Sequence, residues 1–327
     1  MDSFLDHIVI DNFKSIRNCQ LTNLKRINLF IGTPGSGKSN LLEALLLSAL
    51  PFLRQFNNEY LNQVVRTEYI YDLFHYGESE SGICIVSNLF DCLVEVGDDQ
   101  LLARVRLEKA GKSDFIYSVG QRLKIELRDT AAFMKPPVVP YTYPYEFKHR
   151  NSSGKRLAAP FGCNLLSIVE TNEDFRRLVN RLVGNVDLEL TLRGPLEFYR
   201  REKSVGERVS FNSLGTTLQR MIFYQAAIES NENTVLLFDC PETRIFPSML
   251  GDLTSQIRLS TTNQFLISTH SPTILDDLLE NCRAELAVFI VCNEAGQSRF
   301  RRLTDTELHD VFQYRVDAFT NHQAFVP

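Results

Sequence analysis

One segment, IGTPGSGKSNLLEAL from Ile31 to Leu45, limits the possible folds of this chain more than any other feature. It contains the pattern G-x-x-x-x-G-K-[ST], whose glycines let the backbone turn its N–H groups toward a phosphate. The segment from Arg26 to Ile31, RINLFI, predicts a short buried strand before the pattern, and a helical pattern from Ser39 to Leu50 follows it. Because strand, loop and helix occur in order, the segment predicts a phosphate-binding loop in an α/β fold.

The template assigns different roles to the residues of this loop. Lys38 is expected to reach the β- and γ-phosphates, and the Ser39 hydroxyl is expected to hold Mg²⁺. Pro34 stiffens the loop. The alternative, a glycine-rich turn that matches by chance, is disfavoured by the flanking strand and helix. The expected nucleotide-binding positions are Gly32, Pro34, Gly35, Ser36, Gly37, Lys38, Ser39 and Asn40.

Composition limits the class of protein. The 327 residues are 44% hydrophobic, enough for a large core, and the net charge of -5 argues against a surface that is basic throughout. Seven scattered cysteines without a C-x-x-C pair indicate reduced thiols. No signal peptide is visible, and the apolar run Leu41 to Leu50 is too short to span a bilayer. We expect a soluble cytoplasmic protein.

The apolar pattern changes along the chain. Short alternating runs between about Tyr69 and Arg128 predict an antiparallel β region, and Lys135 to Pro160 predicts an irregular loop. Buried strands at Thr234 to Asp239, Gln264 to Ser268 and Leu286 to Val291 alternate with helical patterns, which indicates a parallel sheet. Other expected helices cover 173–183, 218–229, 247–259 and 272–280, and other expected strands cover 7–10, 19–21, 186–193 and 197–211.

Two downstream strands end in residues suited to nucleotide chemistry. TVLLFDCPE places Asp239 at the carboxyl end of a buried strand, where a Walker B aspartate binds Mg²⁺. The pattern is weak alone but is favoured here by the upstream loop. FLISTHSP brings His270 to the same edge, where it could donate a hydrogen bond to a γ-phosphate or to the attacking water. Taken alone, a surface histidine before a helix start is the favoured interpretation of His270.

Two further features leave alternatives open. SFNSLGTTLQR places Ser213 before an amphipathic helix whose N–H groups could bind an anion, although spacing alone favours an ordinary N-cap. Basic clusters could contact nucleic acid, but a solvated charged face is the favoured interpretation of each. The clusters are Arg193, Arg200, Arg201, Lys203 and Arg208, and Arg299, Arg301 and Arg302.

Taken together, five segments resemble the ATP-binding-cassette (ABC) ATPases of the RecF, SMC and OLD group, in the short forms that lack coiled-coil arms. They are NFKSI at 12–16, the phosphate loop, SLGTTLQR, DCPETRIFP at 239–247, and STHSP. The resemblance covers both ends of the chain well and 57–160 poorly. It implies that ATP and Mg²⁺ are bound, with Ser39 and Asp239 as metal ligands and His270 near the γ-phosphate.

In that family the signature loop, here Ser213 and Gly215, contacts the nucleotide of a partner subunit, and Lys14 is a weaker candidate for a nucleotide contact. The sequence departs from the family at Cys240, where a catalytic Glu is usual. A thiol is a poor hydrogen-bond acceptor, and losing a general base costs roughly 10²- to 10⁴-fold in rate. Glu242 lies close by in the sequence and is the candidate substitute.

Two more positions also depart from the family pattern. Thr217 stands where a second signature glycine is common, and neither Gln100 nor Gln121 fits the usual Q-loop.

The resemblance implies one composite ATPase domain over 1–327. Residues 1–56 would supply the first strands, loop and helix, 57–160 a β-rich insertion, and 161–327 the signature, Walker B and switch-histidine lobe. The expected fold is a P-loop ABC-ATPase head with a mostly parallel core sheet and an antiparallel lobe.

The expected activity is slow ATP hydrolysis by a homodimer or higher oligomer that sandwiches ATP. This nucleotide-gated dimer would control a separately encoded effector or nuclease in anti-phage defence or DNA repair. About 35 residues follow the last expected strand, too few for a fused nuclease domain. The alternative is an ATP-binding scaffold or regulatory protein that does not hydrolyse ATP.

Overall fold

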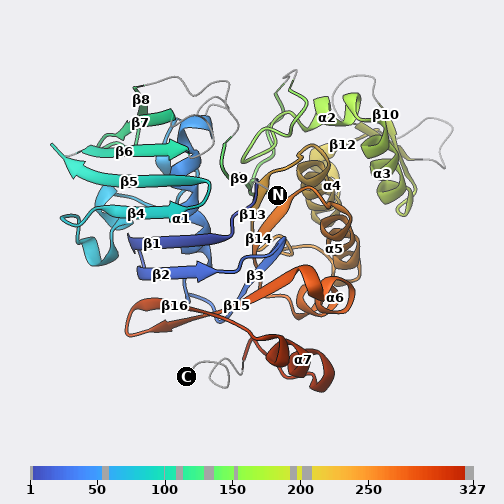
Figure 1. Ribbon diagram of the computed structural model, residues 1–327. Helices are drawn as coiled ribbons and strands as arrows, with labels where there is room; N and C mark the ends of the chain where they lie inside the picture. The colour runs from blue at the N-terminus through green and yellow to red at the C-terminus, as the bar shows by residue number, and fades with distance from the viewer. Residues whose placement is uncertain are drawn as a thin grey trace. The chain divides into compact units, whose positions relative to one another are not determined.

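The computed structural model describes residues 3–53, 59–98, 100–107, 113–128, 136–150, 154–191, 197–200 and 208–320. The chain forms two compact units that alternate along the sequence (Figure 1). The first consists of Met1–Pro140, Asn233–Cys240 and Asn263–Pro327, and the second of Tyr141–Glu232 and Pro241–Thr262. The chain therefore leaves and re-enters the first unit twice.

A seven-stranded antiparallel sheet occupies one side of the first unit (Figure 1). Along β6 every second residue is buried, as expected for a sheet with one covered face. The antiparallel region expected from Tyr69 is therefore present, and it also includes the two N-terminal strands. The strand order is β2 (Ile16–Thr22), β1 (His7–Phe13), β4 (Ile83–Ser87), β5 (Phe90–Gly97), β6 (Gln100–Leu107), β7 (Ser113–Val119) and β8 (Ile125–Leu127).

The second sheet of this unit contains the strand that leads into the phosphate loop. Its order is β16 (Gln297–Arg302), β15 (Leu286–Glu294), β3 (Ile27–Ile31), β14 (Gln264–Ser268), β13 (Val235–Asp239) and β9 (Val139–Tyr141). The strands from β15 to β13 pair in parallel, whereas β16 is antiparallel to β15. Every residue of β3 and β14 is buried, which explains why most of their residues are apolar without alternation.

Helix α1 (Lys38–Leu53) packs against strands of both sheets, namely β1, β5 and β7 of one and β13 and β14 of the other. Nearly all of its residues are buried, so it is apolar around its whole circumference. Pro51 lies in its last turn and has no N–H to bond the Leu47 carbonyl. The buried Tyr117 hydroxyl of β7 donates to that carbonyl at 2.9 Å instead.

Helices α6 (Pro272–Cys282) and α7 (Asp305–Tyr314) also belong to this unit. The sequence analysis did not predict α7 or β16. The part of this unit that the structure describes also contains the short 3₁₀ segments η2 (Leu61–Gln63), η3 (Ile70–Leu73), η4 (His75–Gly77) and η7 (Arg283–Glu285). All seven cysteines of the chain are free. Among the described residues, no helix combines the length and apolarity needed to cross a membrane.

The second unit is built around α4 (Thr216–Glu229), which contacts three other helices. These are α2 (Leu165–Thr171), α3 (Glu173–Gly184) and α5 (Leu250–Leu259). A small antiparallel sheet of β10 (Leu188–Thr191), β11 (Glu197–Arg200) and β12 (Arg208–Ser210) belongs to the same unit. Short 3₁₀ segments η5 (Phe211–Ser213) and η6 (Pro247–Met249) precede α4 and α5.

Several expected elements differ from the structure in this part of the chain. The interpretation of 197–211 as one strand is wrong, because β11 and β12 are separate antiparallel strands. The loop expected from Lys135 to Pro160 contains β9, which is too short to show a period. Helix α2 was missed for the same reason, since seven residues cover only about two turns.

Candidate nucleotide site

The phosphate loop connects β3 to α1 and has the backbone that its glycines permit. Gly35 and Gly37 have φ values of 77° and 104°, in the region that side chains rarely adopt. Lys38 is 4% exposed, and its Nζ donates to the carbonyls of Gly32 at 2.9 Å and Thr33 at 2.8 Å. The ammonium group is therefore held inside the loop, where a bound phosphate would meet it.

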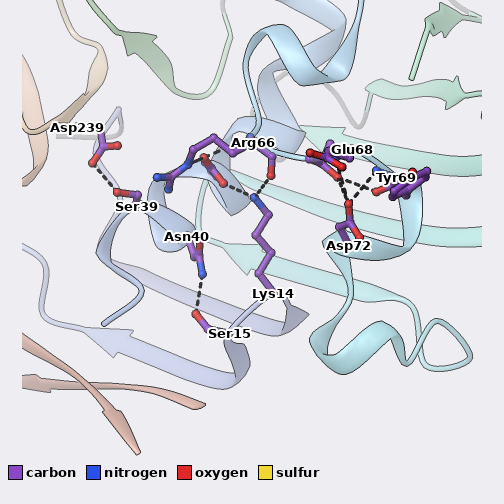
Figure 2. Close-up of polar contacts among 11 residues, drawn as sticks. Lys14, Ser15, Ser39, Asn40, Arg66, Glu68, Tyr69, Asp72 and Asp239 are labelled. Carbon is purple, nitrogen blue, oxygen red and sulfur yellow. Dashed lines mark hydrogen bonds and ion pairs between the residues drawn. The ribbon is translucent and has the colours of Figure 1, made fainter. Parts of the chain in front are cut away.

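The first residues of α1 face the end of β13. Ser39 Oγ donates to Asp239 Oδ1 at 2.9 Å (Figure 2). Ser268, the register partner of Asp239 on β14, also donates its hydroxyl to that oxygen. A hydroxyl and a carboxylate next to a phosphate loop form the oxygen-rich donor set that Mg²⁺ prefers. These residues therefore fit the ion that the resemblance implies, and the ion would shield phosphate charge.

Cys240 directly follows β13 in a left-handed conformation, with φ 47°. Its N–H donates to the carbonyl and to the hydroxyl of Ser268, both at 3.0 Å. Its sulfur lies 3.5 Å from the same hydroxyl oxygen. The thiol thus stands beside Asp239, in the position for which the sequence resemblance implies a catalytic carboxylate. Glu242 is half-buried and belongs to the second unit.

His270 follows β14 by two residues and is exposed. Its pKa lies below the usual value because of desolvation and the positive charge of Lys38, with Asp239 acting in the opposite direction. The imidazole is therefore neutral at pH 7 and has one ring N–H to donate. Five candidate residues of the first unit therefore lie close together. The charges of Lys38 and Asp239 act on the pKa of His270. Ser39 donates to Asp239, and Cys240 is the next residue in the chain.

Arg66 is a site residue that the sequence analysis missed. Its Nε donates to Glu43 Oε1 at 2.6 Å, while Lys14 Nζ contacts Glu43 Oε2 at 2.5 Å and the Arg66 carbonyl at 2.7 Å (Figure 2). Partial burial works to lower the pKa of Arg66, but Glu43 and, to a lesser extent, Asp239 raise it above its usual value. The guanidinium is therefore within electrostatic range of Asp239.

No local pattern marks Arg66, because it lies in an irregular segment and depends on Glu43 of α1 for its position. Glu43 is nearly buried, with 9% of its side chain exposed. Burial lowers the pKa of Lys14 below its usual value, although Glu43 works against this effect. Lys14 is thus an anchored cation between the β1–β2 turn and α1, and its contact with a nucleotide remains a prediction.

Other predicted residues lie in different surroundings. Asn40 Nδ2 donates to Ser15 Oγ at 2.6 Å, so its amide faces the β1–β2 turn (Figure 2). In the second unit, the N-cap of α4 is Gly215, without a capping side chain, so the N-cap interpretation of Ser213 is wrong. Ser213 is exposed and exchanges a 2.8 Å hydrogen bond with Ser210.

The remaining candidates give weaker signals. Gln100 and Gln121 line an open surface pocket with Arg122, Lys124 and Glu126. Of the basic clusters, Arg193, Arg201 and Lys203 lie outside the described residues, and the side chain of Arg200 does too. Arg208 is exposed. In the C-terminal cluster, Arg299 pairs with Glu294 and Arg301 with Glu307, whereas Arg302 is half-buried.

Comparison with known proteins identifies the fold. No family model matches. The DNA replication and repair protein RecF of Leptospira biflexa, in two strains, is 41% identical over 78 residues, which is 24% of this chain. This chain spans only 20% of the length of those curated relatives.

Two solved SMC heads match over almost the whole chain. An SMC head bound to the C-terminal winged-helix domain of ScpA has a TM-score of 0.57 at 14% identity, covering 94% of this chain and 99% of that one. In fold, this chain is similar to these SMC heads. A second such head has an extended coiled coil and is bound to the C-terminal domain of ScpA from Pyrococcus furiosus. Its TM-score is 0.51 at 12% identity, with coverages of 95% and 99%.

The parallel sheet that this chain shares in fold with SMC heads explains why the motif residues of the first unit converge. In such a head the parallel strands end at one edge of the sheet, so Asp239 and His270 follow neighbouring strands at the edge where the loop leaves β3. The α/β P-loop fold predicted from the sequence is supported at this level. The resemblance to OLD proteins remains a prediction.

Proposed function

We propose that this RecF/SMC-type head binds ATP together with Mg²⁺ and hydrolyses the nucleotide slowly. The observation that carries the proposal is the hydrogen bond of 2.9 Å between Ser39 and Asp239 beside a loop that already contains the Lys38 ammonium. In this arrangement the loop N–H groups and Lys38 would bind the phosphates. Ser39 and Asp239 would hold the ion, and neutral His270 would face the γ-phosphate.

We further propose that two copies close around ATP and that this closure controls a separate effector or nuclease. The N-terminus of α4 has no capping side chain, which suits it to a phosphate of a second copy. The matched SMC heads are bound to ScpA, and RecF is named as a replication and repair protein. DNA repair or anti-phage defence is therefore the setting that we infer.

Calorimetric titration of the full chain with ATP and MgCl₂ tests the binding step. Lys38→Ala removes the only side chain that the phosphate template places on the β- and γ-phosphates, so its Kd should rise on the order of 100-fold or more. Lys124→Ala, at an exposed lysine just before β8, is the control and should bind like the wild type. Equal affinities for wild type and Lys38→Ala would contradict the proposal.

The second candidate function is an ATP-binding scaffold that does not hydrolyse, and the thiol of Cys240 beside Asp239 favours it. Measuring the phosphate released from ATP distinguishes the two candidate functions. Slow ATPase activity predicts release that exceeds the Lys38→Ala background at saturating ATP. Release equal to that background, from wild type that binds ATP normally, supports the scaffold.

A further inference from the structure

The hairpin formed by β15 and β16 lies directly against the backbone of the phosphate loop. A Cβ placed on Gly32 would stand 2.1 Å from the Val291 carbonyl oxygen. One placed on Gly37 would stand 1.9 Å from the Ser298 hydroxyl oxygen. No side chain fits in either space, so the hairpin and loop pack this closely only because both positions are glycine.

Ser298 connects this loop to the turn between β1 and β2. Its hydroxyl donates to the Ser36 carbonyl at 2.7 Å, and its backbone N–H donates to the Ser15 carbonyl at 2.7 Å. The two hydroxyl oxygens of Ser15 and Ser298 are 2.6 Å apart, and Asn40 Nδ2 donates to Ser15 Oγ, also at 2.6 Å (Figure 2). Ser298 is 1% exposed, so water does not compete for these contacts.

The protons in this network have one arrangement. A serine hydroxyl has a single proton to donate, and Ser298 gives its proton to the Ser36 carbonyl. The contact between the two hydroxyls must therefore use the proton of Ser15. The hydrogen bonds run in series from Asn40 to Ser15, then to Ser298, and end on the Ser36 carbonyl. Bonds in such a series polarise and strengthen one another.

The series ends on the loop itself, and this has a consequence for phosphate binding. A peptide unit is planar and trans, so the Ser36 carbonyl and the Gly37 N–H point in opposite directions. Holding the carbonyl toward Ser298 holds the Gly37 N–H away from the hairpin. In loops of this template the backbone N–H groups bind the phosphates, so the direction of the Gly37 N–H bears on nucleotide binding.

We propose that Ser298 is a positioning residue for the nucleotide site. It fixes the Ser36–Gly37 peptide in its phosphate-binding orientation before the nucleotide arrives, with Ser15 and Asn40 supporting it. Without the Ser298 hydroxyl, the buried Ser36 carbonyl loses its donor and the peptide is free to rotate toward another partner. This inference rests on the proposed binding of ATP.

Titration of ATP into the full-length Ser298→Ala variant tests the inference. We expect its Kd for ATP to rise about tenfold, and its Kd for ADP to rise by a similar factor, because the phosphate loop contacts both nucleotides. Ser87→Ala is the matched control. Ser87 is also buried and donates to a backbone carbonyl, that of Phe90 at 2.9 Å, but it belongs to the antiparallel sheet. Both variants should lower Tm similarly, and only Ser298→Ala should weaken ATP binding.

Two further variants keep the test decisive. Ser298→Cys replaces the hydroxyl with a slightly larger group that is a weaker donor, so it should weaken binding in the same direction even if Ser298→Ala does not fold. Ser15→Ala should weaken binding less, and combining it with Ser298→Ala should add little, because the series is already broken. Wild-type affinity in both Ser298 variants would overturn the inference. If the wild type itself binds no ATP, the proposed function fails instead.

Discussion

At position 240 the chain carries a thiol where the sequence resemblance implies a carboxylate. The Cys240 backbone is held by two hydrogen bonds from its N–H to Ser268, and its sulfur stays within 3.5 Å of the Ser268 hydroxyl. The residue already has a Cβ in a left-handed conformation, so a longer side chain adds no new backbone strain. Position 240 can therefore be exchanged while Asp239 and Ser39 keep their places.

We expect Cys240→Glu to raise ATP turnover roughly 10²-fold or more, because the new carboxylate can orient or deprotonate the attacking water. Steady-state phosphate release at saturating ATP measures the change. Cys240→Gln has nearly the same shape without the charge and serves as the control, with turnover near that of the wild type. If Cys240→Glu binds ATP but gains no rate, the site lacks another part of the hydrolytic machinery.

Sequence patterns pointed to the candidate site residues that belong to local motifs and missed those that depend on long-range contacts. Lys38, Ser39 and Asp239 could be predicted because each has a fixed place in a loop or at a strand end. Arg66 and Ser298 could not, since neither has a recognisable neighbourhood in the sequence. Each acquires its role from a partner on another element, Glu43 for Arg66 and Ser36 for Ser298.

Among the elements, α1 lacks one backbone hydrogen bond, and a side chain from another element replaces it. Pro51 removes the N–H that would bond the Leu47 carbonyl, in a helix that is almost entirely buried. The Tyr117 hydroxyl of β7 donates to this carbonyl at 2.9 Å. The antiparallel sheet therefore supplies the hydrogen bond that the helix lacks, and it ties the helix that follows the phosphate loop to β7.

Tyr117→Phe should lower the free energy of unfolding by about 1–3 kcal/mol, because it leaves a buried carbonyl without a donor. Urea unfolding of the full chain measures this loss. In a Pro51→Ala background the same change should cost less, since an alanine at this position restores the helical N–H. Equal costs of Tyr117→Phe in both backgrounds would show that the hydroxyl does not compensate for the proline.

The elements themselves were predictable where the apolar period was long. The buried strands near 235, 265 and 287 and the helices at 216–229 and 272–282 all occur, with boundaries shifted by a few residues. Short elements such as β9 and α2 escaped, because three or seven residues do not establish a period. The joining of β1 and β2 to the antiparallel sheet depends on pairing between β1 and β4, which no local pattern shows.

At the scale of the whole molecule, the residues assigned to one nucleotide site are divided between two compact units. Lys38, Ser39 and Asp239 belong to the first, and the signature residues Ser213 and Gly215 to the second. The proposed dimer assigns the signature residues of one copy to the nucleotide of the other. A second copy would then be required to complete each site.

Size-exclusion chromatography with light scattering should therefore show a dimer in ATP and MgCl₂ and a monomer without nucleotide. Gly215→Asp should abolish the dimer by repelling phosphate while leaving ATP binding intact. A Cβ at Gly215 meets no atom within 4 Å and its φ is −57°, so the monomer tolerates the change. Gly251→Asp, equally open and in the same unit, is the control and should still dimerise. A nucleotide-independent elution volume would contradict the gated dimer.

Strand β3, which leads into the phosphate loop, pairs on one side with β14 and on the other with β15. Both partners lie beyond residue 263, so neither has been made when the ribosome completes the loop. During synthesis β3, whose residues are all buried in the folded protein, remains without its neighbouring strands until most of the chain has emerged. The phosphate loop is the most informative motif of the sequence. It can therefore reach its native structure only late in synthesis, after β14 and β15 have paired with β3.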